Sequence, residues 1–480
     1  MKRLIALVLP LVLFLLLALS RPLAPGAVDS RGGRPPNIVL VVADDLGYAE
    51  LGSYGQKRIR TPHLDRLAAE GLRFTDFYAG SPVCAPSRYV LMTGLHGGHA
   101  YLRDNREVQP EGQWPIPDST VTLAELLRAR GYATGAFGKW GLGFVGSEGD
   151  PNRQGFDLFY GYNCQRQAHN FYPTHLWRNN RKELLEGNHR GGTGRQYSHD
   201  LIEAEALRFV REHRDRPFFL FVPFTIPHLA LQVPEDSLAE YRGQWEDPPY
   251  DGKNGYLPHP NPRAAYAAMV TRMDRSVGRL METLRQAGLD RQTIVLFTSD
   301  NGPTYDRLGG SDSDFFRSAG IFRGYKGSVY EGGIRVPLIA RWPGHIKAGR
   351  TSALPAAFYD LLPTLVEIAG GQPHQPVDGI SLVPTLTGRG TQPRHKFLFW
   401  DFNGYGGQQA VRYGDWKGVR RDISKGNRVL ELYDLRRDPG ERDDVARANP
   451  KIVQEIERIL LANHEPSTLF PLPAVDQLRQ

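Results

Sequence analysis

Near the amino terminus the sequence reads Ile38-Val39-Leu40-Val41-Val42-Ala43-Asp44-Asp45, an unbroken apolar run that ends in two carboxylates. Because the run is short, rich in β-branched residues and free of polar alternation, it predicts a strand buried on both faces, as in a parallel sheet. Similar runs recur farther along the chain, at Ala133–Phe137, Phe218–Val222 and Thr293–Thr298.

Helical patterns lie between these runs. Thr61-Pro62 places a proline in the first turn of a helix, and Thr122-x-x-Glu125 is a capping box that begins another. Apolar residues at helical spacing precede the last two strands, within Ile202–Val210 and Met269–Leu284. This alternation predicts the fold class α/β, with a large and mostly parallel sheet sandwiched by helices.

The composition divides the chain into four parts. Residues 1–20 carry Lys2 and Arg3, an apolar run and a small-residue cleavage site, which predicts a signal peptide and export to the periplasm or the medium; an uncleaved membrane anchor is the alternative. A Gly/Pro/Arg-rich linker at 21–36 precedes an α/β domain at 37–385. Hairpin-like strands and a terminal helix at about Pro450–Leu461 predict a small antiparallel α+β subdomain at 386–480.

The overall composition excludes several classes of protein. The chain has 480 residues, of which 40% are hydrophobic and 23% charged, so it is neither disordered, nor collagenous, nor a polytopic membrane protein. Cys84 and Cys164 are its two cysteines, which excludes a disulfide scaffold. The net charge is +7, but the basic residues are scattered, so we expect no nucleic-acid partner. Nothing in the sequence predicts the oligomeric state.

Polar residues follow the predicted strands at their carboxyl ends, where open α/β sheets bind ligands. These residues are Asp44 and Asp45, Lys139, His228, and the pair Asp300-Asn301. Carboxylate and amide oxygens suit Ca²⁺, with Mg²⁺ as the alternative. Taken singly, each pair is more often a turn or a helix cap than a metal site, but two such pairs at the ends of strands favour a metal site.

The most distinctive local feature is Ser81-Pro82-Val83-Cys84-Ala85-Pro86-Ser87-Arg88, which precedes a helix predicted over Tyr89–Gly94. A cysteine beside an arginine and near a helix amino terminus has a lowered thiol pKa and favours anions. A buried structural cysteine is the alternative.

Two motifs resemble the signatures of the sulfatase family: Cys84-Ala85-Pro86-Ser87-Arg88 and Gly138-Lys139-Trp140-Gly141-Leu142-Gly143. The resemblance extends from Asn37 to the carboxyl terminus. It implies an alkaline-phosphatase-like fold and hydrolysis of a sulfate monoester, aryl or carbohydrate, to an alcohol and inorganic sulfate. In this family a formylglycine-generating enzyme oxidises the motif cysteine to formylglycine, whose hydrate offers one hydroxyl for attack on sulfur and a second for expelling sulfate.

The resemblance also implies roles for individual residues. Ca²⁺ would be held by Asp44, Asp45, Asp300 and Asn301, with the modified Cys84 as a further ligand. The hydrate and the sulfuryl oxygens would be stabilised by Arg88, Lys139 and Lys326. His228 would contact the bridging oxygen and assist protonation of the leaving group, so that Lys139, His228 and Lys326 would also bind substrate.

The chain departs from the family at Gly141, where the second signature usually has a histidine that serves as a base in sulfate release. We hypothesise that His169 enters the site from the loop after the sheet, in an altered architecture or as a substrate contact. A surface histidine is the alternative.

Three functions remain open at this point. The favoured one is an exported sulfatase acting on a sulfated small molecule or glycan, with a sulfated polysaccharide preferred because of the export signal and the basic charge. A phosphonate or phosphate monoester hydrolase could use the same groups. A catalytically silent, glycan-binding relative is the third reading, although it would not need the full set of site residues.

Overall fold

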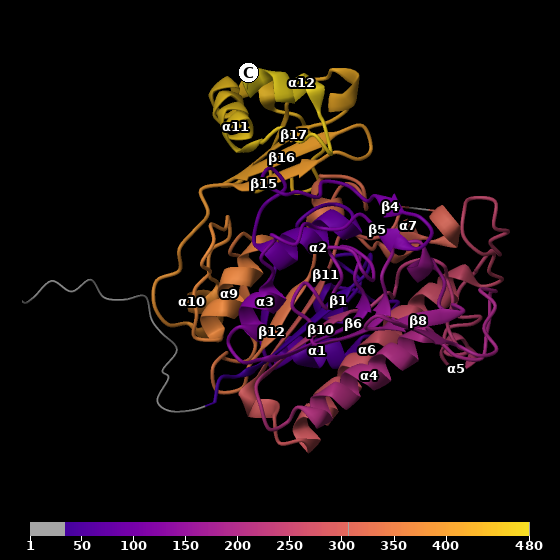
Figure 1. The fold of residues 1–480 in the computed structure, drawn as a ribbon. Coiled ribbons are helices and arrows are strands. Elements are labelled where there is room, and N and C mark those ends of the chain that lie inside the picture. The colour runs from indigo at the N-terminus through magenta and orange to yellow at the C-terminus, as the bar shows by residue number, and fades with distance from the viewer. Residues whose placement is uncertain (1–33, 306, 480) are drawn as a thin grey trace, which may run out of the picture.

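The computed structural model describes residues 34–305 and 307–479 (Figure 1). The predicted signal peptide at 1–20 and all but the last three residues of the predicted linker at 21–36 lie outside this part of the chain.

A ten-stranded mixed sheet forms the centre of the described chain. Its strands are ordered β13 (Arg350–Ser352), β2 (Leu72–Phe74), β12 (Leu338–Arg341), β11 (Thr293–Ser299), β1 (Asn37–Ala43), β10 (Phe218–Pro223), β6 (Ala133–Lys139), β7 (Leu158–Tyr162), β8 (His175–Arg178) and β9 (Arg181–Leu184). From β11 to β7 neighbouring strands run parallel, whereas β12 and β8 pair antiparallel with the strands beside them. The predicted mostly parallel sheet is therefore confirmed, with antiparallel margins.

Strand β1 lies near the middle of the sheet, and every side chain in it is buried. Ile38, Leu40 and Val42 pack into a core with helices α2 (Cys84–Thr93), α3 (Leu123–Arg128) and α9 (Leu361–Ile368). The alternate residues Val39, Val41 and Ala43 pack on the other face with α1 (Pro62–Ala69), α4 (Ser198–Glu212) and α6 (Pro262–Gln286). Both faces of the sheet are covered by helices, as the apolar run predicted.

The predicted helices are present, with one difference at the start of α2. The capping box of α3 is formed, because the Thr122 side chain accepts from the Glu125 N–H and the Glu125 carboxylate accepts from the Thr122 N–H. Helix α2 begins at Cys84, five residues before the expected Tyr89, since Pro86 fits within a first helical turn, where its missing N–H is not needed. Cys84 is consequently the first residue of the helix.

Shorter elements complete the described chain. They are β3 (Phe77–Tyr78) with β14 (Ala356–Ala357), β4 (Glu107–Val108) with β5 (Gly112–Gln113), and helices α5 (Glu235–Leu238), α7 (Ser313–Phe316), α8 (Glu331–Ile334), α10 (Val383–Thr387) and α12 (Pro473–Asp476).

A second, antiparallel sheet lies at the top of Figure 1 and confirms the predicted α+β subdomain. Its strands are β15 (Leu398–Phe402), β16 (Gln408–Tyr413), β17 (Trp416–Arg420) and β18 (Glu431–Asp434), and α11 (Pro450–Asn463) covers one face. On the opposite face Trp400 joins the main core, and its indole N–H donates to Ala79 O at 2.9 Å. The boundary at 386 stays a prediction, because α10 spans that position.

The subdomain also holds the loop that carries Lys326. The Gln408 side chain donates to Gly327 O at 2.7 Å and accepts from Val329 N–H at 3.2 Å. Nearby, the fully buried Lys417 ammonium lies 2.8 Å from the Glu331 carboxylate and 3.3 Å from that of Glu441. Residues from the last part of the chain therefore fix a segment of the central domain.

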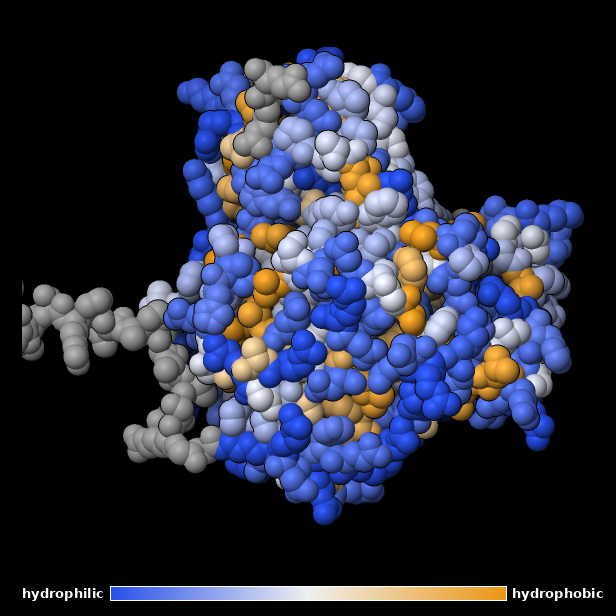
Figure 2. All heavy atoms as spheres, viewed as in Figure 1, coloured by the Kyte–Doolittle hydropathy of each residue, from blue (hydrophilic) through white to orange (hydrophobic). Residues whose placement is uncertain are grey.

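Hydrophilic residues cover most of the molecular surface that Figure 2 shows. Hydrophobic residues on this face are scattered singly or in small groups. Within residues 34–305 and 307–479, no helix combines the length and the apolar character needed to cross a membrane.

We expect Lys417→Met to destabilise the protein strongly, because it removes the buried ammonium group that both the Glu331 and Glu441 carboxylates contact, leaving Glu331 paired with Arg335. Breaking a buried ion pair by removing one partner costs about 3–5 kcal/mol. Urea denaturation would measure the change in unfolding free energy. The control is Lys425→Met, which removes an exposed ion pair with Asp422 in the same subdomain and should change little. Equal effects of the two substitutions would contradict the assignment.

Candidate active site

The carboxyl ends of β1, β6, β10 and β11 meet at one edge of the sheet, where the expected polar residues converge. Asp44 and Asp45 follow β1, Lys139 ends β6, and His228 lies five residues after β10. Asp300 and Asn301 follow β11 directly, and Asp300 N–H donates to Ala43 O at 3.0 Å, which continues the β1–β11 pairing. Adjacent parallel strands thus bring together residues up to 257 positions apart.

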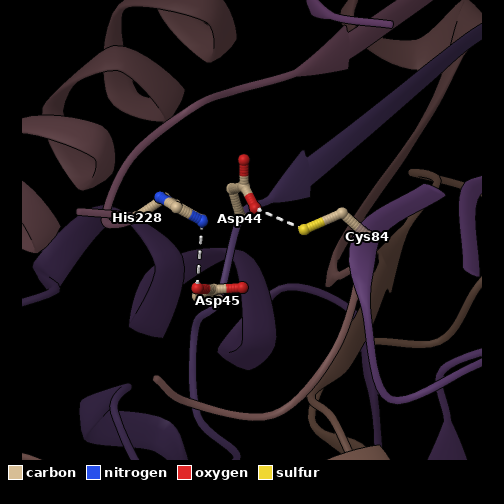
Figure 3. Close-up of side chains that lie close together, drawn as sticks. All are labelled: Asp44, Asp45, Cys84 and His228. Atoms are coloured by element: carbon tan, nitrogen blue, oxygen red, sulfur yellow. Dashed lines mark hydrogen bonds and ion pairs between the residues drawn. The ribbon is translucent and has the colours of Figure 1, made fainter. Parts of the chain in front are cut away.

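The carboxylates and Cys84 form a compact buried group (Figure 3). The Cys84 sulfur lies 3.5 Å from Asp44 Oδ1. The Asp45 N–H donates to Asp300 Oδ1 at 3.2 Å, and the Asn301 side-chain amide donates to Asp45 Oδ1 at 2.8 Å. Negative charge is therefore concentrated on side chains that are almost fully buried.

Three cationic side chains compensate this charge. Arg88 Nη2 donates to Asp300 Oδ2 at 2.8 Å, and the guanidinium also donates to Lys139 O. Lys139 Nζ lies 2.5 Å from Asp44 Oδ2. Lys326 Nζ lies 2.8 Å from Asp45 Oδ2 and reaches the site from the loop held by Gln408.

His228 is held as a neutral acceptor. Its Nδ1 lies 2.6 Å from Leu229 O, and its Nε2 lies 3.1 Å from Lys326 Nζ, so the proton is on Nδ1 and Nε2 accepts from the ammonium. Burial, assisted by the charge of Lys326, lowers the pKa of His228 well below its usual range. His169 stacks on this ring, with centroids 4.6 Å apart and planes 10° from parallel.

The geometry of the cluster suits a divalent cation. The ligand atoms of Asp44, Asp45, Cys84 and His228 all lie within 4.8 Å of one another. Asn301 Oδ1 is buried and has no hydrogen-bond partner among the described residues. Burial, with the neighbouring charge of Asp44, raises the pKa of Asp300 to about 6, so this carboxylate is disfavoured as an anion unless further positive charge is present. Carboxylate and amide oxygens of this kind are the ligands of hard cations.

The expectation that Cys84 has a lowered thiol pKa is wrong. The side chain is 1% exposed, and burial raises its pKa to about 12 despite the positive charges of Lys139 and Lys326. Although Cys84 lies at the start of α2, the absence of water outweighs the favourable field of the helix. An unmodified Cys84 is a thiol at neutral pH. Cys164 is likewise buried and unpaired.

A cavity of about 230 Å³ opens at this edge of the sheet. Of the expected residues, it is lined by Asp45, Cys84, His169, His228 and Lys326. Five of the expected residues do not line the cavity: Asp44, Arg88, Lys139, Asp300 and Asn301. Asp44 contacts Cys84, Asp300 and Asn301 contact Asp45, and Arg88 and Lys139 pair with Asp300 and Asp44. His169 therefore reaches the cavity, as its sequence position led us to suspect.

Several residues that line the cavity were not predicted from the sequence. They include Asn105, Gln113, Gln165, Tyr256, Thr304, Tyr305 and Tyr405. Thr304 donates to Asp45 Oδ2 at 2.8 Å, and Asn105 Oδ1 accepts from Ala85 N–H at 2.9 Å. The position of Thr304, three residues after Asn301, was the one available hint.

Comparisons with known proteins agree with this arrangement. The family model Sulfatase matches residues 36–371, and the model N-sulphoglucosamine sulphohydrolase, C-terminal, matches residues 320–465. Arylsulfatase A of Homo sapiens is 36% identical over 496 aligned positions, covering 93% of this chain and 90% of that protein. Steryl-sulfatase of Mus musculus is 31% identical, covering 93% and 84%. The crystal structure of Ps i-CgsB in complex with k-i-k-neocarrahexaose has a TM-score of 0.74 and 28% identity, covering 90% of this chain and 94% of that one.

We expect the affinity of the cluster for a divalent cation to fall as the pH drops from 7 to 5. In the metal-free protein Asp300 holds a proton below about pH 6, which a cation must displace. One displaced proton changes the affinity by at most about tenfold per pH unit. Titration calorimetry with CaCl₂ between pH 5 and 8 measures this dependence.

The matched variant is Asp300→Asn, which removes both the charge and the titration. It should bind the cation more weakly at pH 7 and with a flatter pH profile. An affinity of the unaltered protein that is constant between pH 5 and 7 would exclude Asp300 as the titrating ligand.

Proposed function

The chain belongs to the sulfatase family and is a sulfuric ester hydrolase, and we propose that it hydrolyses an aryl or carbohydrate sulfate using a formylglycine made from Cys84 and a bound Ca²⁺. The observation that carries this proposal is the placement of Cys84. It lies in the cavity wall at the first residue of α2, 3.5 Å from an Asp44 oxygen, and has no disulfide partner.

The state of Cys84 supports its modification. With a pKa of about 12, the thiol would be a poor nucleophile at neutral pH. Formylglycine at this position supplies, as its hydrate, a hydroxyl nucleophile and a second hydroxyl on the same carbon. A formylglycine-generating enzyme is therefore the maturation partner in this proposal.

The acidic cluster supports the metal. We assign as ligands Asp44, Asp45, Asp300, Asn301 and the modified residue 84. Bound Ca²⁺ supplies a positive charge that polarises a sulfate oxygen. Asn301 contributes the buried Oδ1 that otherwise has no partner in the described chain. Mg²⁺ is the alternative, distinguished by its stricter octahedral geometry.

In this proposal two of the cationic side chains bind the sulfate group, and the third holds a metal ligand in place. In the structure the ammonium groups of Lys139 and Lys326 are engaged by Asp44 and Asp45. A cation held by these carboxylates would weaken their ion pairs, and the ammonium groups would then be available to sulfuryl oxygens. Arg88 remains paired with Asp300 and holds that carboxylate in place.

Protonation of the leaving oxygen falls to Lys326 and His228 together. His228 Nε2 accepts from Lys326 Nζ at 3.1 Å, so the proton lies on the lysine while the histidine is neutral. The charge of Asp45 raises the pKa of Lys326 well above its usual range despite burial, whereas the pKa of His228 is lowered, so Lys326 is the group that can deliver this proton and His228 Nε2 orients the ammonium.

A sulfated glycan is our preferred substrate. The cavity is bordered by Tyr256, Tyr305 and Tyr405, whose rings can stack on a sugar or an aryl group. Similarity to Ps i-CgsB, whose crystal structure contains neocarrahexaose, also supports a carbohydrate. Export, proposed from the amino-terminal segment, would give the enzyme access to extracellular polysaccharide.

The proposal predicts an aldehyde at residue 84 and calcium-dependent turnover of sulfate esters. Mass spectrometry of the Cys84 peptide, from protein made beside a formylglycine-generating enzyme, should show the mass of formylglycine. Cys84→Ala should lower kcat/KM for an aryl sulfate by at least about 10⁴-fold. Cys164→Ala is the control, since that cysteine is equally buried but does not line the cavity. An unmodified thiol, or faster turnover of the matched aryl phosphate, would refute the proposal.

We further expect His169→Ala to lower kcat/KM by roughly 10- to 100-fold, because the stacked ring orients His228. Steady-state kinetics on the best sulfate ester measure the effect. His175→Ala is the control, because His175 belongs to the same part of the chain but pairs with Glu111 outside the cavity. Unchanged turnover would leave His169 without a role.

A further inference from the structure

We propose that the side-chain amide of Gln165 binds the sulfate group of the substrate, in the place that Gly141 leaves open. The inference rests on the proposed function, since it assigns a further contact to the same sulfate. It concerns the cavity wall beside Gly141, where the Gln165 side chain lies.

Adjacent strands bring the two positions together. Beyond the ends of the parallel strands β6 and β7, Trp140 N–H donates to Tyr162 O at 2.9 Å, and Gly141 N–H donates to Asn163 O at 3.1 Å. The two segments therefore run side by side past the edge of the sheet. Gln165 follows two residues later and turns into the cavity that Cys84 also lines.

A side chain at position 141 would displace the Gln165 amide from its present position. A Cβ atom built on Gly141 would lie 2.4 Å from Gln165 Nε2, closer than non-bonded atoms approach, and 3.8 Å from Arg88 Cδ. Gly141 also has φ +82°, which disfavours any residue with a side chain. The amide thus occupies the space that a side chain at 141 would need.

The amide of Gln165 lacks partners within the protein. The residue is 5% exposed, yet neither Nε2 nor Oε1 has a hydrogen-bond partner in the described parts of the chain. Its backbone N–H is fixed by Gln113 Oε1 at 3.3 Å. Buried polar groups are almost always hydrogen-bonded, so an orphaned amide beside the cavity indicates a ligand.

The chemistry of the amide suits an anion. Gln165 Nε2 carries two N–H donors, and sulfate oxygens are acceptors only. Lys326 lines the same cavity and supplies positive charge. Unlike a histidine, glutamine takes up no proton at neutral pH, so its contribution is binding and orientation, and any base must come from elsewhere in the site.

Gln165→Met tests this assignment, because it keeps the length of the side chain and removes the amide. We expect the KM for a sulfate ester and the inhibition constant for inorganic sulfate to rise about tenfold or more, with kcat changed by less than about threefold. Gln167→Met is the matched control, since Gln167 is equally buried but bonds His175 O away from the cavity. It should leave both constants unchanged.

A double-mutant cycle tests this displacement. Gly141→Ala should displace the Gln165 amide and raise the inhibition constant for sulfate as Gln165→Ala does. In the Gln165→Ala background the same substitution should add little to the inhibition constant, because the displaced group is already gone, while the strain at φ +82° lowers the melting temperature in both backgrounds. Additive effects of the two substitutions would overturn the proposed overlap.

The outcomes separate this inference from the proposed function. If the unaltered, calcium-loaded protein hydrolyses sulfate esters and Gln165→Met has the same KM and sulfate affinity, the inference is wrong and the proposed function stands. If Gln165→Met only lowers the melting temperature, the role is packing and the inference is again wrong. If the unaltered protein neither turns over sulfate esters nor binds inorganic sulfate by calorimetry, both fail together.

Discussion

The burial of three carboxylates at one edge of the sheet is the constraint on which the rest of the site depends. Asp44, Asp45 and Asp300 are at most 1% exposed, and charges so placed need compensation within the protein. The compensation comes from three separate segments: Arg88 on α2, Lys139 at the end of β6, and Lys326 on the loop before α8. The ion pairs therefore connect α2 and the Lys326 loop to the ends of β1, β6 and β11, in addition to the hydrogen bonds of the sheet.

The carboxyl-terminal subdomain contributes to the site mainly by supporting the loop that carries Lys326. Gln408 holds both sides of the loop around Gly327, which positions the Lys326 ammonium against Asp45. Lys417 on β17 contacts Glu331 on α8 and Glu441, which forms a second buried charge cluster that joins the subdomain to α8. Rigid support of this kind is what a preorganised site requires.

Much of the fold could be predicted from the sequence, because each central strand is an unbroken apolar run and its polar neighbours follow directly in the chain. The same logic located Asp44, Asp300 and Lys139. It failed where the answer depends on burial or on distant neighbours. The motif predicted a lowered thiol pKa for Cys84, whereas burial raises it. A sequence motif does not reveal how deeply a side chain is buried. Gln165 could not be identified from the sequence, because its amide lies in the space beside Gly141. The two residues are 24 positions apart in the chain, and only the pairing of β6 with β7 brings them together.

Cys84 is synthesised long before the segments that bury it in the folded protein. In the finished fold the side chain is 1% exposed, so an enzyme that modifies it must act before the surrounding segments close. The loop of Lys326 and its support at Gln408 leave the ribosome some 240 to 320 residues after Cys84, on the order of 10 to 65 s at about 5–20 residues per second. If Cys84 is converted to formylglycine as proposed, the long separation between it and the closing segment would provide an interval for that conversion during translation.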